Sequence, residues 1–167
     1  MSQMRLYVMR HGDAGDHASW DGDDFERPLT ERGRERTLAM AEHLDAIGIA
    51  PRRVLTSPLA RAAQTAAIVA EVLGGVETLV QDDRLGAHFG IDGLSRILAD
   101  NEEAEALLLV GHEPTLSRVI ADLIGGGEIL MKKGAVAAVD IAPRAGKGGG
   151  RPSGTLLWLL SPGSLGF

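Results

Sequence analysis

The chain of 167 residues contains no cysteine. It can therefore form no disulfide bond, thiolate nucleophile or cysteine-ligated zinc site, and nothing in it indicates an oxidising compartment. Its longest apolar runs are far shorter than the ~20 residues needed to cross a bilayer. Residues 1–9 also lack the long apolar core of a signal peptide. We therefore expect a cytoplasmic protein without a membrane partner.

Basic residues are in the minority. The 17 Lys and Arg residues against 23 Asp and Glu residues give a net charge of −6, and the pI is near 5.3. This balance argues against a nucleic-acid-binding protein. The hydrophobic fraction of 44% and the charged fraction of 24% are typical of globular proteins. We predict one folded domain spanning residues 1–167.

Short apolar runs alternate with longer amphipathic segments, a pattern that predicts parallel strands connected by helices. The predicted fold class is α/β: a single-domain sandwich whose central, mostly parallel sheet is flanked by helices. The predicted strands are residues 6–9, 53–56, 76–80, 107–110, 135–141 and 155–160, and the predicted helices are residues 30–47, 59–73, 91–99 and 114–124.

Three features between these elements carry further expectations. The acidic segment 13–26 has no clear period and is predicted to be a solvated loop. In the segment after it, the apolar residues Leu38, Ala41, Leu44 and Ile47 recur at spacings of three, which predicts a helix. The glycine-rich segment 143–154 is predicted to be a mobile loop.

Polar residues follow three of the predicted strands. Arg10 and His11 follow the first, Ser57 and Arg61 the second, and His112 the fourth. Ligands of open α/β sheets bind at this carboxyl edge. Two imidazoles and two guanidinium groups repel one another at close range unless an anion lies among them. The sequence therefore predicts a site for a phosphate-like group, which phosphate or sulfate would also occupy.

The residue types suggest a division of roles. Arg10 and Arg61 can each hold two oxygens in a forked geometry. His11 is the candidate nucleophile, because a neutral imidazole nitrogen can attack phosphorus. Its other nitrogen must then donate to a backbone carbonyl, which a turn at Gly12 would supply. His112 is expected to stay protonated and to stabilise the phosphoryl oxygens.

Other readings of these residues are weaker. Ser57 and Pro58 are predicted to begin the helix over 59–73, because no Gly-x-Ser-x-Gly motif marks Ser57 as a nucleophile. A zinc site built from His11, His112 and an aspartate is disfavoured by the neighbouring arginines. No metal or cofactor is therefore expected. The pair at 132–133, both lysines, is predicted to be solvated, with steering of an acidic partner as the alternative.

The motifs of this sequence resemble those of the histidine phosphatase superfamily. The Arg-His-Gly sequence at 10–12 resembles its first motif, segment 57–66 its second-arginine helix, and segment 110–112 its second-histidine site. Segments 9–14, 27–33 and 158–162 are similar to SixA-type phosphohistidine phosphatases. The resemblance implies a phosphoglycerate mutase-like fold. It also implies His11 as the phosphoryl acceptor, with Arg10, Arg61 and His112 as the phosphate pocket. Gly12 and Ser57 are predicted to contact the substrate with them.

One departure from the superfamily pattern bears on the substrate. Many members carry a glutamate proton donor in the region that here spans residues 85–90, where no carboxylate stands. General acid catalysis contributes ~10²–10⁴-fold, so ordinary phosphomonoesters should be poor substrates, whereas a phosphorylated imidazole leaves with less help. The possible substitute donors are Asp13, Asp82, Asp83, His88 and Glu113.

The segment between Phe89 and Leu107 is too short to roof a small-metabolite pocket, so we expect an open cleft. The predicted function is hydrolysis of protein-borne phosphohistidine in signal transduction, through a covalent phospho-His11 intermediate. The partner would be a phosphohistidine-bearing protein, with a histidine phosphotransfer domain as one candidate. The alternatives are a phosphomonoesterase for small phosphorylated molecules and a non-catalytic phosphate-recognition domain.

Overall fold

The computed structural model describes residues 3–143 and 150–167. In this part of the chain a sheet of six strands runs in the order β3-β2-β4-β1-β5-β6. Strands β1 (Met4–Arg10), β2 (Arg53–Thr56), β3 (Thr78–Gln81) and β4 (Ala106–Gly111) are parallel. Strand β5 (Val136–Ile141) runs antiparallel to β1, and β6 (Gly154–Leu160) antiparallel to β5. The predicted α/β class with a mostly parallel sheet is confirmed.

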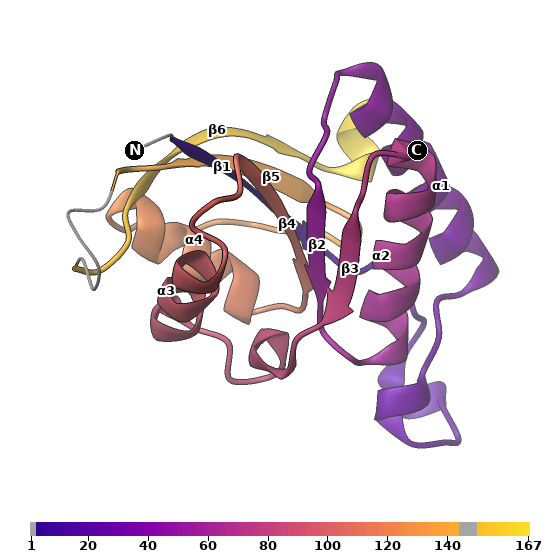
Figure 1. Cartoon of the computed structure of the whole chain (residues 1–167). Coiled ribbons are helices and arrows are strands. Elements are labelled where there is room, and N and C mark those ends of the chain that lie inside the picture. The colour runs from indigo at the N-terminus through magenta and orange to yellow at the C-terminus, as the bar shows by residue number, and fades with distance from the viewer. Residues whose placement is uncertain (1–2, 144–149) are drawn as a thin grey trace.

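Helices cover both faces of the sheet (Figure 1). Helices α1 (Glu31–Ala46) and α2 (Ala60–Leu73) pack on one face and bury Tyr7 and Met9 of β1. Helices α3 (Ile91–Asp100) and α4 (Thr115–Ile124) pack on the other and bury Leu6 and Val8. Successive side chains of a strand point to opposite faces, so β1 contributes to both halves of the core.

Most predicted boundaries lie within two residues of the observed ones. Strand β3 begins at Thr78, two residues later than predicted, and residues 53–56 form β2 as expected. The apolar spacing that predicted α1 does not coincide with the buried face of the helix, because Leu38 is 44% exposed while Thr37 and Met40 are buried. Of the glycine-rich segment 143–154, residues 144–149 lie outside the described residues, so its mobility stays a prediction.

The acidic segment 13–26 was predicted to be a loop without regular structure. It contains two short 3-10 helices, η1 (His17–Ser19) and η2 (Asp24–Glu26). Its start is fixed against α1, where a Cβ atom added to Gly33 would lie 2.0 Å from the carbonyl oxygen of Asp13. Only glycine permits this close approach of the backbone. The loop after β1 therefore has a defined path.

No helix among the described residues combines the length and the apolar character that crossing a bilayer requires.

Candidate active site

The three strands that carry the candidate residues end at the same edge of the sheet. Strand β4 lies between β1 and β2, and its Gly111 is in register with Arg10. The pairing continues beyond the strands, because the amide of His11 donates to the carbonyl of Gly111 and the amide of Ser57 to that of Val110, both at 3.0 Å. The sheet thus places residues 11, 57 and 112 next to one another.

His11 and His112 face each other across this edge, with their ring centroids 5.2 Å apart. The Nδ1 atom of His11 lies 2.7 Å from the carbonyl oxygen of Gly12. Because a carbonyl oxygen can only accept, Nδ1 carries the hydrogen and Nε2 holds a free electron pair. The hydrogen bond expected between His11 and Gly12 is therefore present.

The electrostatic environment keeps His11 neutral. The pKa of His11 is lowered to about 3, mainly by burial and also by His112, Arg61 and Arg10, while the hydrogen bond to Gly12 acts in the opposite direction. The residue His11 is 7% exposed, so the charged form of its imidazole loses most of its hydration. At neutral pH, His11 can act as a nucleophile without first losing a proton.

His112 is neutral in the free protein, and the protonated state expected beside a bound phosphate stays a prediction. The pKa of His112 is lowered to about 4, mainly by burial and also by Arg61 and Arg10, while Asp24 opposes the shift. Its Nε2 atom lies 2.7 Å from Oγ of Ser57. Sequence reasoning foresaw the cationic neighbours of His112 but not the degree of burial, which favours the neutral ring.

The interpretation of Ser57 as a helix cap is wrong. Helix α2 begins at Ala60, with Leu59 at the N-cap position and no side-chain cap. The Oγ atom of Ser57 accepts a hydrogen bond from the amide of Leu59 at 3.3 Å and also contacts His112. Ser57 is fully buried, and it connects the start of the α2 segment to an imidazole of the candidate site.

Gly12 has both of its backbone polar groups engaged. Its carbonyl accepts from His11, and its amide donates to Oγ1 of Thr65 at 3.0 Å. Thr65 in turn donates to the carbonyl of Arg61 at 2.7 Å. These contacts join the loop after β1 to the first turn of α2, and so place Arg61 relative to His11.

Arg61 is held by a residue that sequence reasoning missed. Its Nη1 atom donates to the carbonyl of Asp24 at 2.9 Å, and its Nη2 atom to the Asp24 carboxylate at 3.1 Å. Arg27 also donates to this carboxylate, at 2.8 Å, and Arg27 followed by Arg61 lower the pKa of Asp24. A buried arginine needs a carboxylate partner, so the isolated acidic segment before α1 was the available signal.

Arg10 reaches the site from the end of β1. Its Nη1 atom donates to the carbonyl of Met131 at 3.0 Å. Burial lowers the pKa values of both Arg10 and Arg61. Both guanidinium groups nevertheless stay charged at neutral pH, because the ordinary pKa of arginine is above 12.

Buried polar atoms without partners concentrate at this site. Among the described residues the buried side-chain atoms with no hydrogen-bond partner are Nε of Arg10, Nε of Arg61, Nδ1 of His112 and Oγ1 of Thr37. Each such atom costs about 1–3 kcal/mol when it stays unpaired. Three of the four belong to candidate site residues with cationic neighbours, and an anionic ligand would supply acceptors for them.

The substitute proton donors are not equivalent. Lys133 and Arg84 lower the pKa values of Asp13 and Asp82, respectively, through short hydrogen bonds, so both carboxyl groups are ionised at neutral pH. Asp83 and His88 are exposed. Glu113 accepts from the amide of Ser117 at 2.9 Å and interacts electrostatically with Arg10.

Both lysines at 132–133 are exposed, as expected. Lys133 also has an ion-pair partner. The Nζ atom of Lys133 lies 2.6 Å from the carboxylate of Asp13, so this lysine is tied to the loop that follows His11.

Comparison with known proteins connects this geometry to a family. Residues 6–92, which include His11 and Arg61, match the Histidine phosphatase superfamily (branch 1). The chain belongs to this superfamily. An Escherichia coli relative, the phosphohistidine phosphatase SixA, is 30% identical over 97% of this chain and 96% of its own length. An uncharacterised protein of Picosynechococcus is 39% identical over 68% of each chain.

A solved structure supports the superfamily assignment over the whole fold. The protein histidine phosphatase SixA complexed with tungstate superposes with a TM-score of 0.83, at 29% identity, over 97% of this chain and 99% of that chain. The phosphoglycerate mutase-like architecture expected from the motifs is thereby confirmed.

Proposed function

We propose that this superfamily member hydrolyses phosphohistidine carried by another protein, through a covalent phosphoryl intermediate on His11. The observation that carries the proposal is the hydrogen bond from Nδ1 of His11 to the carbonyl of Gly12. It leaves Nε2 unprotonated in a buried, cationic site. The similarity to SixA over 97% of the chain supports the choice of substrate class.

In the first step, Nε2 of His11 attacks phosphorus in line while the P–N bond of the substrate breaks. The leaving imidazole takes the electron pair of that bond. When its other nitrogen carries a proton, it departs as neutral imidazole and needs no acid from the enzyme. In the second step, water attacks phospho-His11. A P–O bond forms, the electron pair of the second P–N bond returns to His11, and the protons of the water leave on phosphate and solvent.

Arg10, Arg61 and His112 hold the phosphoryl oxygens in both steps. The two guanidinium groups neutralise charge on the oxygens, in a site from which water is largely excluded. A bound phosphoryl dianion raises the pKa of His112 by placing negative charge beside it. His112 then gains the proton that it lacks in the free protein. Ser57 orients this ring and Gly12 orients His11.

The ionised states of Asp13 and Asp82 favour phosphohistidine over phosphate esters as the substrate. An alkoxide leaving group needs a proton during bond cleavage. Asp13 and Asp82, which are held ionised by Lys133 and Arg84, are poor donors at neutral pH. We place the chain, as one domain of residues 1–167, in the cytoplasm and acting on a protein such as a histidine phosphotransfer domain.

The deciding experiment compares kcat/KM for a phosphohistidine peptide, a phosphohistidine-bearing protein domain and p-nitrophenyl phosphate under identical conditions. The proposal requires preference for the phosphohistidine substrates. A clear preference for the ester would instead assign a small-molecule phosphomonoesterase. Phosphate binding without turnover of any substrate would indicate a phosphate-recognition domain.

A further inference from the structure

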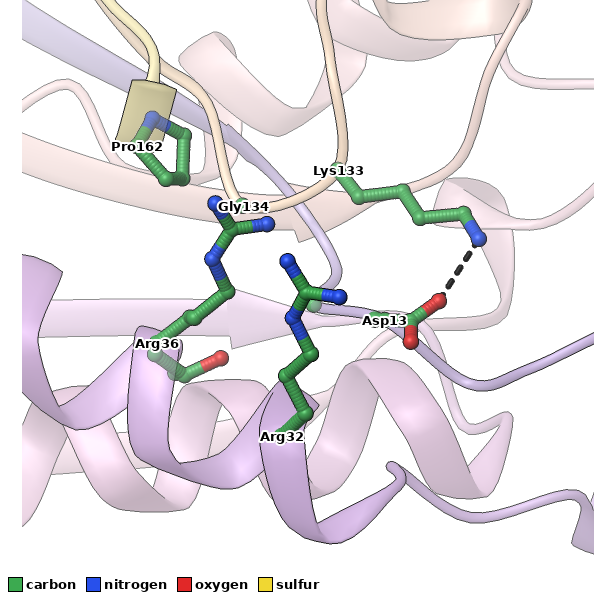
Figure 2. Close-up of a pocket in the computed structure, with 8 residues that line it drawn as sticks. Asp13, Arg32, Arg36, Lys133, Gly134 and Pro162 are labelled. Carbon is green, nitrogen blue, oxygen red and sulfur yellow. Dashed lines mark hydrogen bonds and ion pairs between the residues drawn. The ribbon is translucent and has the colours of Figure 1, made fainter. Parts of the chain in front are cut away.

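A hollow lies beside the loop that carries His11 (Figure 2). Its volume is about 240 Å³. Arg32 and Arg36 extend side by side from α1 into this hollow, and Lys133 approaches from the segment that precedes β5. Gly12, the residue after His11, also lines it. We refer to this hollow as the Arg32 pocket.

The cations of the Arg32 pocket are unequally engaged. Lys133 is paired with Asp13 at 2.6 Å, and Arg36 donates a hydrogen bond to the backbone oxygen of Phe167. Neither a hydrogen bond nor an ion pair joins the side chain of Arg32 to any other described residue. With one aspartate against three basic side chains, the lining is positive, although the whole chain carries a net charge of −6.

An unpartnered buried hydroxyl lines the same pocket. Thr37 is 1% exposed, and its Oγ1 atom has no hydrogen-bond partner among the described residues. A buried hydroxyl without a partner is unfavourable. Thr37 and Arg32 thus provide a neutral donor and a charged donor that neither the fold nor the active site employs.

The placement of the two arginines is unfavourable for α1 itself. Arg32 stands in the first turn of the helix, where the helix dipole disfavours a positive charge. Arg36 follows four residues later on the same face, and like charges at this spacing repel. Both unfavourable effects are reversed when an anion binds between the guanidinium groups.

We propose that the Arg32 pocket binds a carboxylate side chain of the partner protein, near the phosphohistidine in its sequence or fold. The inference rests on the proposed function. Gly12 adjoins His11 and also lines the pocket, and the Cα atoms of adjacent residues are only ~3.8 Å apart. A partner whose phosphohistidine enters the active site therefore brings its neighbouring residues to the pocket. An arginine fork matches a carboxylate in shape and charge.

The test uses pairs of phosphohistidine peptides that differ only in Glu or Gln, placed at successive positions on either side of the phosphohistidine. The enzyme variants are Arg32→Gln and the matched control Arg34→Gln. Arg34 is also exposed on α1 but does not line the pocket. For at least one position, kcat/KM of the unaltered protein should be about fivefold higher with Glu than with Gln, the size expected for a partly exposed ion pair. This ratio should fall to near one in Arg32→Gln and persist in Arg34→Gln.

Two results would overturn the proposal: no preference for Glu at any position, or the same loss of preference in both variants. A direct titration of the unphosphorylated Glu and Gln peptides into the protein, followed by NMR, separates this inference from the proposed function. If no phosphohistidine peptide is hydrolysed, the proposed function fails, while Glu-dependent shifts that are lost in Arg32→Gln still support the pocket. If inorganic phosphate displaces the Glu peptide from the pocket as well as a carboxylate does, the site is a general anion site and the assignment to a carboxylate is wrong.

Discussion

Asp24 holds Arg61 through two separate contacts, one from its backbone carbonyl at 2.9 Å and one from its carboxylate at 3.1 Å. The first contact does not use the side chain of residue 24, whereas the second depends on it. Asp24 is therefore a positioning residue that fixes where the Arg61 guanidinium points, and it adds a negative charge that opposes the lowering of the His112 pKa.

Replacing Asp24 with Asn should lower kcat/KM for phosphohistidine about tenfold, because a misplaced guanidinium stabilises the transition state less well. The pKa of His112 should fall further, which can be followed by NMR titration of its ring. Asp21→Asn removes a charge from the same segment at an exposed position and serves as the control. An equal effect of both substitutions would show that segment charge matters and that the contact with Arg61 does not.

Arg10→Ala and Arg61→Ala should each lower kcat by at least ~10²-fold, because each removes a charged donor from the phosphoryl oxygens. Arg61→Lys should restore only part of the loss, since a lysine lacks the forked geometry. Arg34→Ala, at an exposed position of α1, controls for the loss of a positive charge. Activity equal to that of the unaltered protein in either Arg10 or Arg61 variant would refute its role.

A covalent intermediate should be detectable on the peptide that contains His11. Rapid quenching without acid followed by mass spectrometry should show an added phosphoryl group of about 80 Da. His11→Asn should lose both this adduct and turnover, while His43→Asn, a change at a histidine of α1 outside the candidate site, should keep both. An adduct that persists in His11→Asn would place the acceptor elsewhere.

The two buried histidines should make the protein less stable in mild acid. The pKa of His112 is lowered from 6.5 to about 4 in the folded state, so between these pH values the unfolded state binds more protons. The stability that neutral His112 confers is complete above pH 6.5 and falls as the pH drops towards 4. At pH 5 the loss from His112 is about 2 kcal/mol.

Urea unfolding at pH 7 and pH 5 measures this loss. The difference in unfolding free energy should shrink by about 2 kcal/mol in His112→Gln. Phosphate should also reduce the difference, because a bound anion favours protonated His112. A pH dependence that is identical in His112→Gln and the unaltered protein would contradict the assignment.

Gly33→Ala should destabilise the fold by about 1–3 kcal/mol, the range for forcing atoms into a packed region. The added Cβ would lie 2.0 Å from the carbonyl oxygen of Asp13, and backbone cannot yield as a side chain can. Gly75→Ala is the control, because its nearest contact would be 3.9 Å and its φ is not in the left-handed region. Unchanged unfolding midpoints in Gly33→Ala would show that the loop after β1 moves freely.

The elements of the sheet could be predicted because their signals are local. Residues 107–110 are an uninterrupted apolar run, and such a run is typical of a strand that is buried on both faces. The same reasoning predicted that His11 and His112 lie at the same edge of the sheet, because parallel strands have their carboxyl ends at one edge. Apolar spacing failed on α1, where Leu38 is exposed and Thr37 is buried. Thr37 is covered by the loop at Gly12, a contact across the fold that periodicity does not encode.

The other features that the sequence did not predict have the same origin, namely contacts between distant parts of the chain. The pairing of Asp24 with Arg61 joins residues 37 positions apart, and the contact of Ser57 with His112 joins residues 55 positions apart. A sequence pattern shows which residues need a hydrogen-bond or ion-pair partner, but it does not show which residue will be that partner in the folded protein. The neutral state of His112 depends on how many atoms surround it, which is likewise a property of the packed structure.

The separation of the two imidazoles is set by the spacing of the strands in the sheet. Neighbouring strands lie ~4.8 Å apart, and His11 and His112 directly follow the adjacent strands β1 and β4. A change in the connections around them, such as segment 13–26, would therefore alter which molecules can enter the site. It would not change the distance between the imidazoles of His11 and His112. The same pair of histidines would then act on substrates of many different shapes.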